Sequence, residues 1–287
     1  MAALAAGTEA YADPAAPPVR VRPSWLSLRE PVDAAARSTE LPDLLRPVLD
    51  RGARLVVHDL GCGTGSMGRW LAPRLGGPQH WVLHDRDADL LVHAARERPE
   101  AASGGATVSV ETRRSDVTRL RPDDLEGASL VTASALLDMM TADEVDRFAA
   151  TASSAGCPVL VTISVVGRVE LRPADPLDAD VTDAFNAHQR RTAGGRRLLG
   201  PDAAERAAEA FERHGHDVVL RPSPWRLDHR HGTLLTQWLT GWIGAACEQR
   251  PELVPATSGY TVSRLADART GRLDVTVAHL DLLALPR

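Results

Sequence analysis

Short apolar runs alternate with segments of helical periodicity along the first 170 residues of the chain. The clearest unit is residues 54–71, RLVVHDLGCGTGSMGRWL, in which the β-branched run 55–57 predicts a buried strand and the residues from Ser66 onward follow helical spacing. Further strands are predicted at 80–84, 107–112, 129–133 and 158–166. Strands that alternate with helices in this way predict a parallel sheet in an α/β fold.

The spacing of the elements changes after residue 170. A helix is predicted at 200–214, started by Pro201 and Asp202, and strands are predicted at 217–222 and 272–284. Two segments between these elements remain, at 177–199 and 225–269. We expect both to form helical cap insertions over the substrate.

The chain is expected to divide into an N-terminal tail with a helical lid at 1–49 and a main α/β domain at 50–287. Residues 1–23 are rich in Ala and Pro, which predicts a flexible lead or a partly ordered tail. Two helical patterns follow within 25–50, and we expect them to be broken at Pro31 and Pro42. Trp25 is a candidate to cover the cofactor or substrate opening, and packing of its helix on the sheet edge is the alternative.

Three glycines form a turn between the first strand and its helix. Gly61, Gly63 and Gly65 let a ligand approach the backbone, because glycine has no Cβ atom. Residues 63–68 match the dinucleotide pattern G-x-G-x-x-G, but this register begins two residues late relative to the strand. The carboxylate of Asp59, just before the turn, would repel a diphosphate and attract the ammonium group of S-adenosylmethionine (SAM). Asp59 therefore favours SAM.

Composition excludes several classes of function. The net charge of −5 argues against a polynucleotide partner, and all 33 basic residues are arginine, which excludes Schiff-base and pyridoxal phosphate chemistry. The three cysteines are isolated, so neither a disulfide framework nor a zinc cluster is indicated, and we expect no metal. With no apolar run long enough to span a bilayer and no signal peptide, a cytoplasmic protein without a membrane partner is expected. The Ala- and Arg-rich composition resembles that of actinobacterial, high-GC bacterial proteins.

Residues 59–65, DLGCGTG, resemble motif I of the class I SAM-dependent methyltransferases, whose usual form is hydrophobic-x-D-x-G-x-G-x-G. Asp85 lies 20 residues past Gly65, where an acid accepts hydrogen bonds from the ribose hydroxyls of a nucleotide cofactor. Residues 84–91, HDRDADLL, resemble motif II of the family. The resemblance implies a doubly wound, mostly parallel seven-stranded sheet of the Rossmann-like methyltransferase type, ending in an antiparallel strand.

The same resemblance implies further contacts to SAM. In this family an acid followed by a small or apolar residue after the third strand holds the adenine amino group, and Asp116 and Val117 match. Asp116 could instead open a turn. Ser134 follows the fourth strand, where these enzymes present groups to the transferred methyl. The cofactor-binding residues that we expect are Asp59, Gly61, Gly63, Gly65, Asp85, Asp116, Val117 and Ser134.

The residues after the fourth strand bear on the acceptor. Family members that methylate exocyclic amino groups of bases or of glutamine carry an Asn/Asp-Pro-Pro-aromatic motif there, whereas residues 133–136 of this chain are Ala-Ser-Ala-Leu. This difference favours a small-molecule substrate over nucleic acid. Asp138 is the titratable residue nearest to the expected methyl group, and it is either a general base or the cap of the helix that begins near Thr141.

The two insertions supply the other candidates. His188 is a second candidate base, because imidazole titrates near neutral pH, and Phe185 lies one turn away on the same face of its predicted helix. Arg190 is a candidate to bind a carboxylate or phosphate on the substrate. Trp238 lies four residues before Trp242 on an apolar helix, where it either packs in the core or lines a pocket for a flat substrate.

The sequence therefore predicts SAM-dependent methyl transfer to an oxygen, nitrogen or carbon atom of a small-molecule metabolite. Because the sulfonium already activates the methyl group, the protein has to align the reacting atoms and remove a proton where needed. An NAD-dependent oxidoreductase that uses residues 63–68 is one alternative. A protein of the same fold that binds SAM without transferring its methyl group is another.

Overall fold

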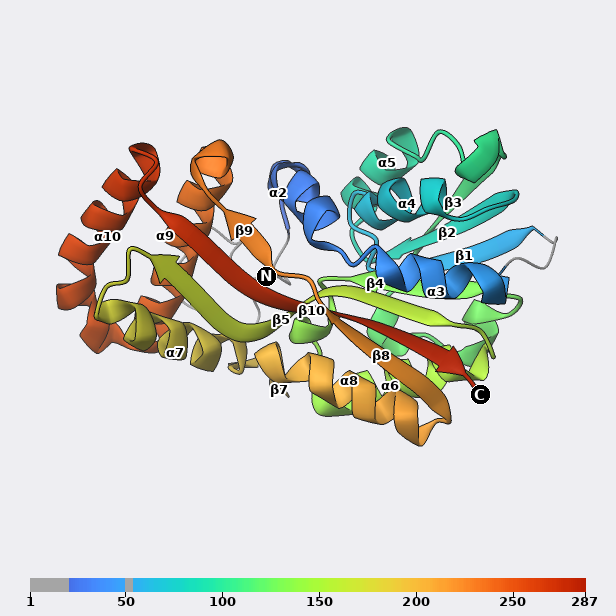
Figure 1. Ribbon diagram of the computed structural model, residues 1–287. Coiled ribbons are helices and arrows are strands. Elements are labelled where there is room, and N and C mark those ends of the chain that lie inside the picture. Colours follow the sequence, from blue (N-terminus) through green and yellow to red (C-terminus); the bar gives the residue numbers. More distant parts are fainter. Residues whose placement is uncertain (1–20, 50–53) are drawn as a thin grey trace.

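Figure 1 shows the computed structural model of the chain, which describes residues 21–49 and 54–287. The predicted flexible lead therefore lies mostly outside the described residues. The strands of the main sheet are β1 (Leu55–Leu60), β2 (Gln79–Asp85), β3 (Val108–Arg114), β4 (Leu130–Ser134), β5 (Val159–Arg172), β8 (His216–Pro222), β9 (Trp225–Leu227) and β10 (Asp274–Pro286). A separate two-stranded ribbon is formed by β6 (Thr192–Ala193) and β7 (Arg196–Arg197).

The order of the strands is β3-β2-β1-β4-β5-β10-β8, with β9 paired to β10. The first five of these strands run parallel to their neighbours, and β10 is antiparallel to both β5 and β8. The predicted doubly wound, mostly parallel sheet with an antiparallel final strand is therefore confirmed. The chain leaves β1 in one direction to build β2 and β3 and then returns to β4 on its other side. The carboxyl ends of β1 and β4 are therefore the topological switch point, where open α/β sheets bind ligands in a crevice.

The helices that accompany these strands are α2 (Pro23–Ala36), α3 (Glu40–Leu49), α4 (Ser66–Leu71), α5 (Ala88–Arg96), α6 (Ala142–Ser154), α7 (Leu177–Gln189), α8 (Ala203–Arg213), α9 (Gly232–Gln249) and α10 (Val254–Arg269). Short 3-10 turns connect them: η1 (Ala72–Arg74), η2 (Ser103–Gly105), η3 (Val117–Arg119), η4 (Pro122–Leu125), η5 (Leu137–Met139), η6 (Gly200–Asp202), η7 (His229–His231) and η8 (Pro251–Leu253). Within the described ranges, no helix is both long enough and apolar enough to cross a membrane.

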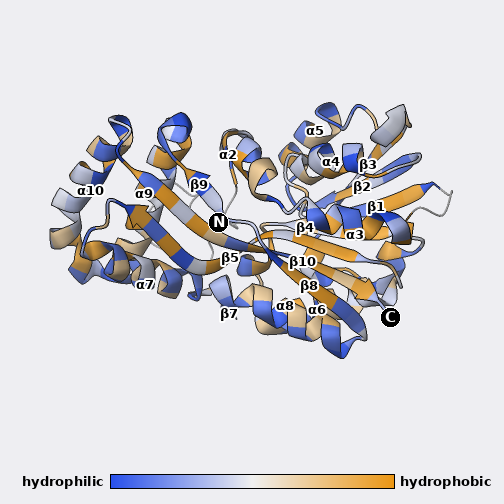
Figure 2. Ribbon diagram, in the orientation of Figure 1, coloured by the Kyte–Doolittle hydropathy of each residue, from blue (hydrophilic) through white to orange (hydrophobic). Residues whose placement is uncertain are grey.

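Helices cover both faces of the main sheet. On one face α3 and α4 contribute Leu45 and Trp70 to a core that also contains Trp81 of β2. On the other face Phe148 of α6 and Phe211 of α8 pack edge to face, with ring centroids 6.0 Å apart. Figure 2 shows the hydrophobic residues concentrated along the central strands between these helices. The first half of β5 is buried throughout and mostly apolar, as expected for a strand that is covered on both faces.

A second lobe is built on the extensions of β5 and β10. Both strands continue beyond the main sheet and remain paired as far as Arg172 and Asp274. The predicted insertions supply α7, α9 and α10, which surround this ribbon (Figure 1), and their apolar residues form a third core. The second insertion begins with a strand, β9, that joins the sheet beside β10, so it is not wholly helical as expected. The period-two pattern of residues 168–172 in β5 marks the extension.

The N-terminal segment departs from its prediction at Pro31. This residue lies inside α2, and the chain breaks instead at residues 37–39, between α2 and α3. Tertiary packing compensates for the lost backbone hydrogen bond, because Trp25 and Val32 on the same helix are buried in the core of the second lobe. Pro42 also causes no break, because it lies in the first turn of α3, where a backbone N–H has no partner within the helix.

A buried ion pair within α2 also accepts a hydrogen bond from β9, which attaches the helix to this strand. The Nε and Nη2 atoms of Arg29 donate to Asp33 at 2.8 and 3.0 Å, and Nε1 of Trp225 donates to the same carboxylate at 2.9 Å. Arg29 and Asp33 are each only 4% exposed. The Arg29 guanidinium also lies 5.1 Å from the centroid of the Trp225 ring. These contacts hold α2 at the junction of the two lobes.

We expect Asp33→Asn to lower the free energy of unfolding by about 3–5 kcal/mol, because it leaves the buried Arg29 charge without its counterion. The measurement is urea unfolding followed by circular dichroism. Asp43→Asn is the matched control: it removes the partner of Arg46, but both side chains are more than half exposed, so a change below about 1 kcal/mol is expected. Equal effects of the two substitutions would contradict this role of Asp33.

Candidate functional site

The glycine turn lies at the carboxyl end of β1, in the crevice beside β4. The backbone N–H groups of Gly61 and Cys62 both donate to the carbonyl oxygen of His84, at 2.8 and 2.9 Å. Gly61 and Gly63 have φ angles of +69° and +56°, a region that side chains with a Cβ atom rarely adopt. The turn is thus fastened to the end of β2, and its glycines are required by its backbone conformation.

Asp59 lies under this turn with an incomplete set of partners. Its side chain is 1% exposed, and its Oδ1 atom accepts a hydrogen bond of 2.8 Å from Thr132 on β4. Its Oδ2 atom is buried and has no hydrogen-bond partner among the described residues. Burial raises the pKa of Asp59 to about 6. A buried carboxylate oxygen without a donor is suited to a ligand that brings a cation or an N–H group.

Asp85 ends β2 and supports the turn from the other side. Its Oδ2 atom accepts from the N–H of Gly63 and its Oδ1 atom from the N–H of Asp87, both at 2.9 Å. Burial raises its pKa, and these two hydrogen bonds oppose the rise. Each oxygen keeps a free lone pair for a further donor, since a carboxylate oxygen accepts two hydrogen bonds. The geometry is compatible with the expected contact to ribose hydroxyls.

Asp116 caps the turn η3. It accepts from the backbone N–H and the hydroxyl of Thr118, at 3.0 and 2.8 Å, and its side chain is 47% exposed. It therefore does open a turn, in agreement with the alternative interpretation, and its exposed carboxylate also remains able to meet an adenine amino group. The predicted contact with adenine stays a prediction.

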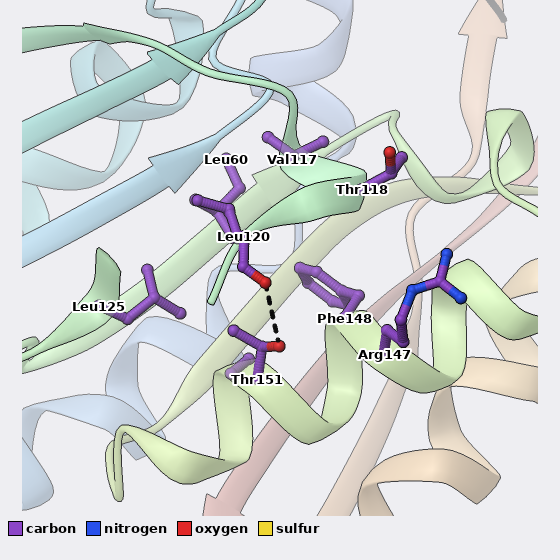
Figure 3. Close-up of a pocket in the computed structure, with 9 residues that line it drawn as sticks. Leu60, Val117, Thr118, Leu120, Leu125, Arg147, Phe148 and Thr151 are labelled. Atoms are coloured by element: carbon purple, nitrogen blue, oxygen red, sulfur yellow. Dashed lines mark hydrogen bonds between the residues drawn. The ribbon is translucent and has the colours of Figure 1, made fainter. Parts of the chain in front are cut away.

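Val117 borders a small hollow between η3 and α6, which Figure 3 shows. The hollow has a volume of about 10 Å³ and is lined mainly by apolar side chains, including Leu60 and Phe148. The hydroxyl of Thr151 donates to the carbonyl of Leu120 at 3.5 Å along its wall. This space holds at most about one water molecule, so it is not a binding site for a base.

Ser134 ends β4, and an arginine that the sequence analysis did not select binds its hydroxyl. Nη2 of Arg37 donates to Ser134 Oγ at 3.0 Å and to Ser66 Oγ at 3.1 Å, and its Nε donates to Thr162 Oγ1 at 3.3 Å. Arg37 is 2% exposed and lies between α2 and α3. No periodic pattern marks a residue in a helix–helix linker, so only the folded chain identifies it.

The helix α2 covers the glycine turn. The Cδ1 atom of Leu26 lies 3.1 Å from the point where a Cβ atom on Gly63 would stand. Glu30 on the same helix forms a double hydrogen bond with Arg69 of α4, at 2.7 and 2.6 Å. A ligand that lies across the turn therefore also meets α2, and the role of this helix as a lid stays a prediction.

Asp138 lies on η5, directly after β4, and is 6% exposed. It does not cap α6, so that alternative is wrong. The cap is Thr141, whose hydroxyl accepts from the N–H of Glu144 at 3.2 Å, while the Glu144 carboxylate accepts from the N–H of Thr141 at 2.9 Å. Asp138 is also close enough to Arg191 to influence its pKa. Its role as a general base stays a prediction.

His188 is buried on α7, and both of its ring nitrogens have neighbours. Nε2 lies 3.2 Å from a carboxylate oxygen of Glu248 on α9, and Nδ1 lies 3.2 Å from Nη1 of Arg191. Burial, assisted by the charge of Arg191, lowers the pKa of His188 to about 4, so the ring is neutral at pH 7. To act as a base it would have to exchange one of these neighbours for the acceptor.

The remaining substrate candidates lie in or beside the second lobe. Trp25, Phe185 and Trp238 are all buried in its core, and the ring of Trp238 stacks on that of Trp242 with centroids 5.1 Å apart. Phe185 and Trp238 border a hollow of about 10 Å³, which has room for about one water. This packing corresponds to the core alternative for Trp238.

Arg190 is held by a carboxylate of this chain. Its Nε and Nη2 atoms donate to the two oxygens of Asp202, both at 2.6 Å, which joins the end of α7 to η6. A contact between Arg190 and a substrate anion stays a prediction and would compete with Asp202. In the described part of the chain, no group of three or more His, Cys, Asp or Glu side chains is arranged to hold a metal ion.

Comparison with known proteins identifies the segment that carries the turn. Residues 57–155 match the family described as "Methyltransferase domain", from within β1 to just beyond α6. No curated protein matches the sequence.

Similar solved structures include the cyclopropane synthase MmaA2 from Mycobacterium tuberculosis, at 16% identity over 85% of this chain and 82% of that chain, with a TM-score of 0.43. A SAM-dependent methyltransferase from Geobacter sulfurreducens in complex with S-adenosyl-L-homocysteine is 16% identical over 90% of this chain and 98% of that chain, with a TM-score of 0.41. The corresponding complex of an enzyme from Thiobacillus denitrificans is 18% identical over 88% and 93% of the two chains, with a TM-score of 0.42.

These structural likenesses are distant, so the assignment depends on the family match and on the turn. The matched residues contain β1 to β4 in the predicted order, the glycine turn and Asp85. Residues 57–155, about a third of the chain, are thus similar to a methyltransferase domain.

Proposed function

We propose that this protein transfers the methyl group of SAM to a small-molecule metabolite. When bound, SAM supplies a methyl group already activated on its sulfonium. The chain then has to bind the cofactor, hold the acceptor in line with the methyl carbon and remove a proton where the acceptor carries one.

The unpartnered oxygen of Asp59 is the observation that carries this proposal. A buried carboxylate oxygen without a donor costs free energy unless a ligand completes it. The α-ammonium group of SAM is both a cation and a hydrogen-bond donor, so it satisfies the oxygen and offsets the charge. A diphosphate at the same position would be repelled, which disfavours the dinucleotide alternative.

Asp85 supports the same orientation of the cofactor. Its carboxylate already holds the backbone of Gly63, so ribose hydroxyls bound to it would lie against the turn. We propose that Asp116 and Val117 then meet the adenine, beside η3. The nucleoside would thus extend along the carboxyl ends of β2 and β3, and the amino-acid tail of SAM would point toward Asp59 and β4.

The acceptor is proposed to be a small molecule rather than a nucleic acid. Residues 133–136, which end β4, lack the Asn/Asp-Pro-Pro-aromatic motif of enzymes that act on base amino groups, and the net charge is −5. The second lobe stands beyond the carboxyl end of the sheet, where it can enclose an acceptor together with α2 (Figure 1). Trp25, Phe185, Arg190 and Trp238 stay proposed contacts on that side. The three aromatic side chains would have to leave their packing in the second-lobe core to reach an acceptor.

We favour Asp138 over His188 as the group that accepts a proton. Asp138 lies on η5, four residues after the end of β4, near which the methyl group is expected. His188 lies between Glu248 and Arg191 and would have to exchange one of them for the acceptor. Arg191 lies near both His188 and Asp138 and would stabilise their arrangement.

Incubation with methyl-labelled SAM and a small-molecule cell extract tests the proposal. We expect labelled product with the wild-type protein and none with Asp85→Ala, because loss of the ribose contacts weakens cofactor binding by on the order of 100-fold. Asp89→Ala, at an exposed position on the neighbouring helix α5, is the matched control and should retain activity. A protein that binds NADH but not SAM in calorimetry would contradict the proposal. A protein that binds SAM and labels nothing would support the non-catalytic alternative.

The raised pKa of Asp59 predicts that Asp59→Asn stabilises the cofactor-free protein. The rise from 3.8 to about 6 makes the folded state bind more protons than the unfolded state between those values, so stability is lost as the pH rises through this window. At pH 7.5 the variant should be more stable by up to about 3 kcal/mol, and the difference should vanish near pH 4. Urea unfolding at pH 4, 6 and 7.5 measures this.

The same Asp59→Asn variant should bind S-adenosyl-L-homocysteine more weakly than the wild type, although it is more stable. Asp217→Asn controls for the loss of one negative charge, because the side chain of Asp217 is 69% exposed and pairs with Arg287 at the surface. A variant that is less stable than the wild type at pH 7.5 would show that Asp59 is not a strained carboxylate.

A further inference from the structure

Arg37 is a buried cation whose hydrogen-bond acceptors are all neutral. Besides the hydroxyls of Ser66, Ser134 and Thr162, it donates to the carbonyl oxygen of Ser66 at 3.5 Å. Among the described residues, no carboxylate lies within ion-pairing distance of it, and its side chain is 2% exposed. The guanidinium group of Arg37 lies over the Trp70 ring, with its Cζ atom 5.4 Å from the ring centroid. Burying a guanidinium among neutral groups is unfavourable, and burial lowers its pKa.

None of the carboxylates nearest to Arg37 accepts a hydrogen bond from it. Asp33 accepts from Arg29 and Trp225. Asp281 accepts from the backbone N–H groups of Ser38 and Ile163, both at 2.8 Å. Asp59 interacts with Arg37 only through space, and its Oδ2 atom has no partner among the residues that the structure describes. The crevice between β1 and β4 thus holds one anion and one cation that do not pair with each other.

A ligand with an ammonium and a carboxylate group on the same carbon complements this arrangement. We propose that Arg37 binds the α-carboxylate of the cofactor, while Asp59 binds the α-ammonium group. The three hydroxyls that now hold Arg37 stand in for that carboxylate. The planar guanidinium is suited to the role, because it binds a carboxylate through two parallel hydrogen bonds. The inference rests on the proposed function, since it assigns the residue that recognises the tail of SAM.

The position of Arg37 gives this contact a second consequence. Arg37 directly follows α2, the helix that places Leu26 over Gly63 and Glu30 against Arg69. A cofactor with a carboxylate therefore binds to the base of the lid, whereas a cofactor without one does not. Transfer of Arg37 to the carboxylate would also release Ser134, the residue expected to contact the cofactor at the end of β4.

Two ligands that differ in this tail test the proposal. S-Adenosyl-L-homocysteine carries the amino-acid tail, and 5′-methylthioadenosine has the same nucleoside and sulfur without it. We expect Arg37→Met to weaken the binding of S-adenosyl-L-homocysteine by about 10- to 100-fold and that of 5′-methylthioadenosine by less than about 3-fold. Arg37→Lys should fall between the wild type and Arg37→Met, because lysine keeps the charge but loses the paired donors. Isothermal titration calorimetry of both ligands gives the ratio.

Arg74→Met is the matched control. The Arg74 guanidinium lies on the same Trp70 ring, 4.7 Å from the centroid, but it donates to the carbonyl oxygen of Trp70 and not to the hydroxyls that hold Arg37. The Arg74→Met substitution should leave the affinities for both S-adenosyl-L-homocysteine and 5′-methylthioadenosine unchanged. If Arg37→Met weakens the binding of both ligands equally, or of neither, the assignment of Arg37 to the α-carboxylate is wrong, while the assignment of SAM as the cofactor still stands. If the wild type binds neither ligand, the proposed function fails instead. Because each variant is judged by the ratio of two affinities, partial loss of folded protein does not change the outcome.

Discussion

The site depends on a carboxylate that the chain buries without completing its hydrogen bonds. Asp59 lies one residue before the end of β1, beneath the glycine turn, and within the described part of the chain only one of its oxygens has a donor. A folded protein of modest stability keeps such a group only where another constraint requires it. The turn and the carboxylate together define a place where positive charge is favoured and a diphosphate is not. This electrostatic preference distinguishes the crevice from a dinucleotide site with a similar glycine pattern.

The second lobe faces the proposed cofactor site (Figure 1). Because β5 and β10 continue past the main sheet, α7, α9 and α10 stand opposite the carboxyl ends of the strands (Figure 1). The helix α2 touches both sides: Trp25 is part of the second-lobe core, and Leu26 packs over the turn. The helix α2 would thus cover both the cofactor and the acceptor.

Local patterns in the sequence were sufficient for the turn and for most of the sheet, but not for β9 or for the extension of β5. Apolar runs located the strands, and the spacing from Gly65 to Asp85 placed the acid at the end of β2, where it holds Gly63. The wrong predictions also had physical causes. Pro31 indicated a helix break, but packing of Trp25 and Val32 overrode it.

Contacts between distant residues could not be predicted from spacing. Arg37 meets Ser134 and Thr162 from about a hundred residues away, so its burial follows only from the fold. His188 was selected for its intrinsic pKa, yet Glu248 on another helix and Arg191 on the same side of the lobe surround the ring, and burial lowers that pKa. Side-chain chemistry indicated candidates in both cases, and long-range packing decided what each side chain contacts.

The most direct test of the central claim is the titration of Asp59 itself. Carboxyl resonances of protein labelled with ¹³C-aspartate, assigned with Asp59→Asn, give its pKa with and without S-adenosyl-L-homocysteine. The account predicts a pKa of about 6 in the free protein and a fall below about 4 in the complex, because an ammonium group beside the carboxylate stabilises its charged form. A pKa that stays the same or rises on binding would contradict the account.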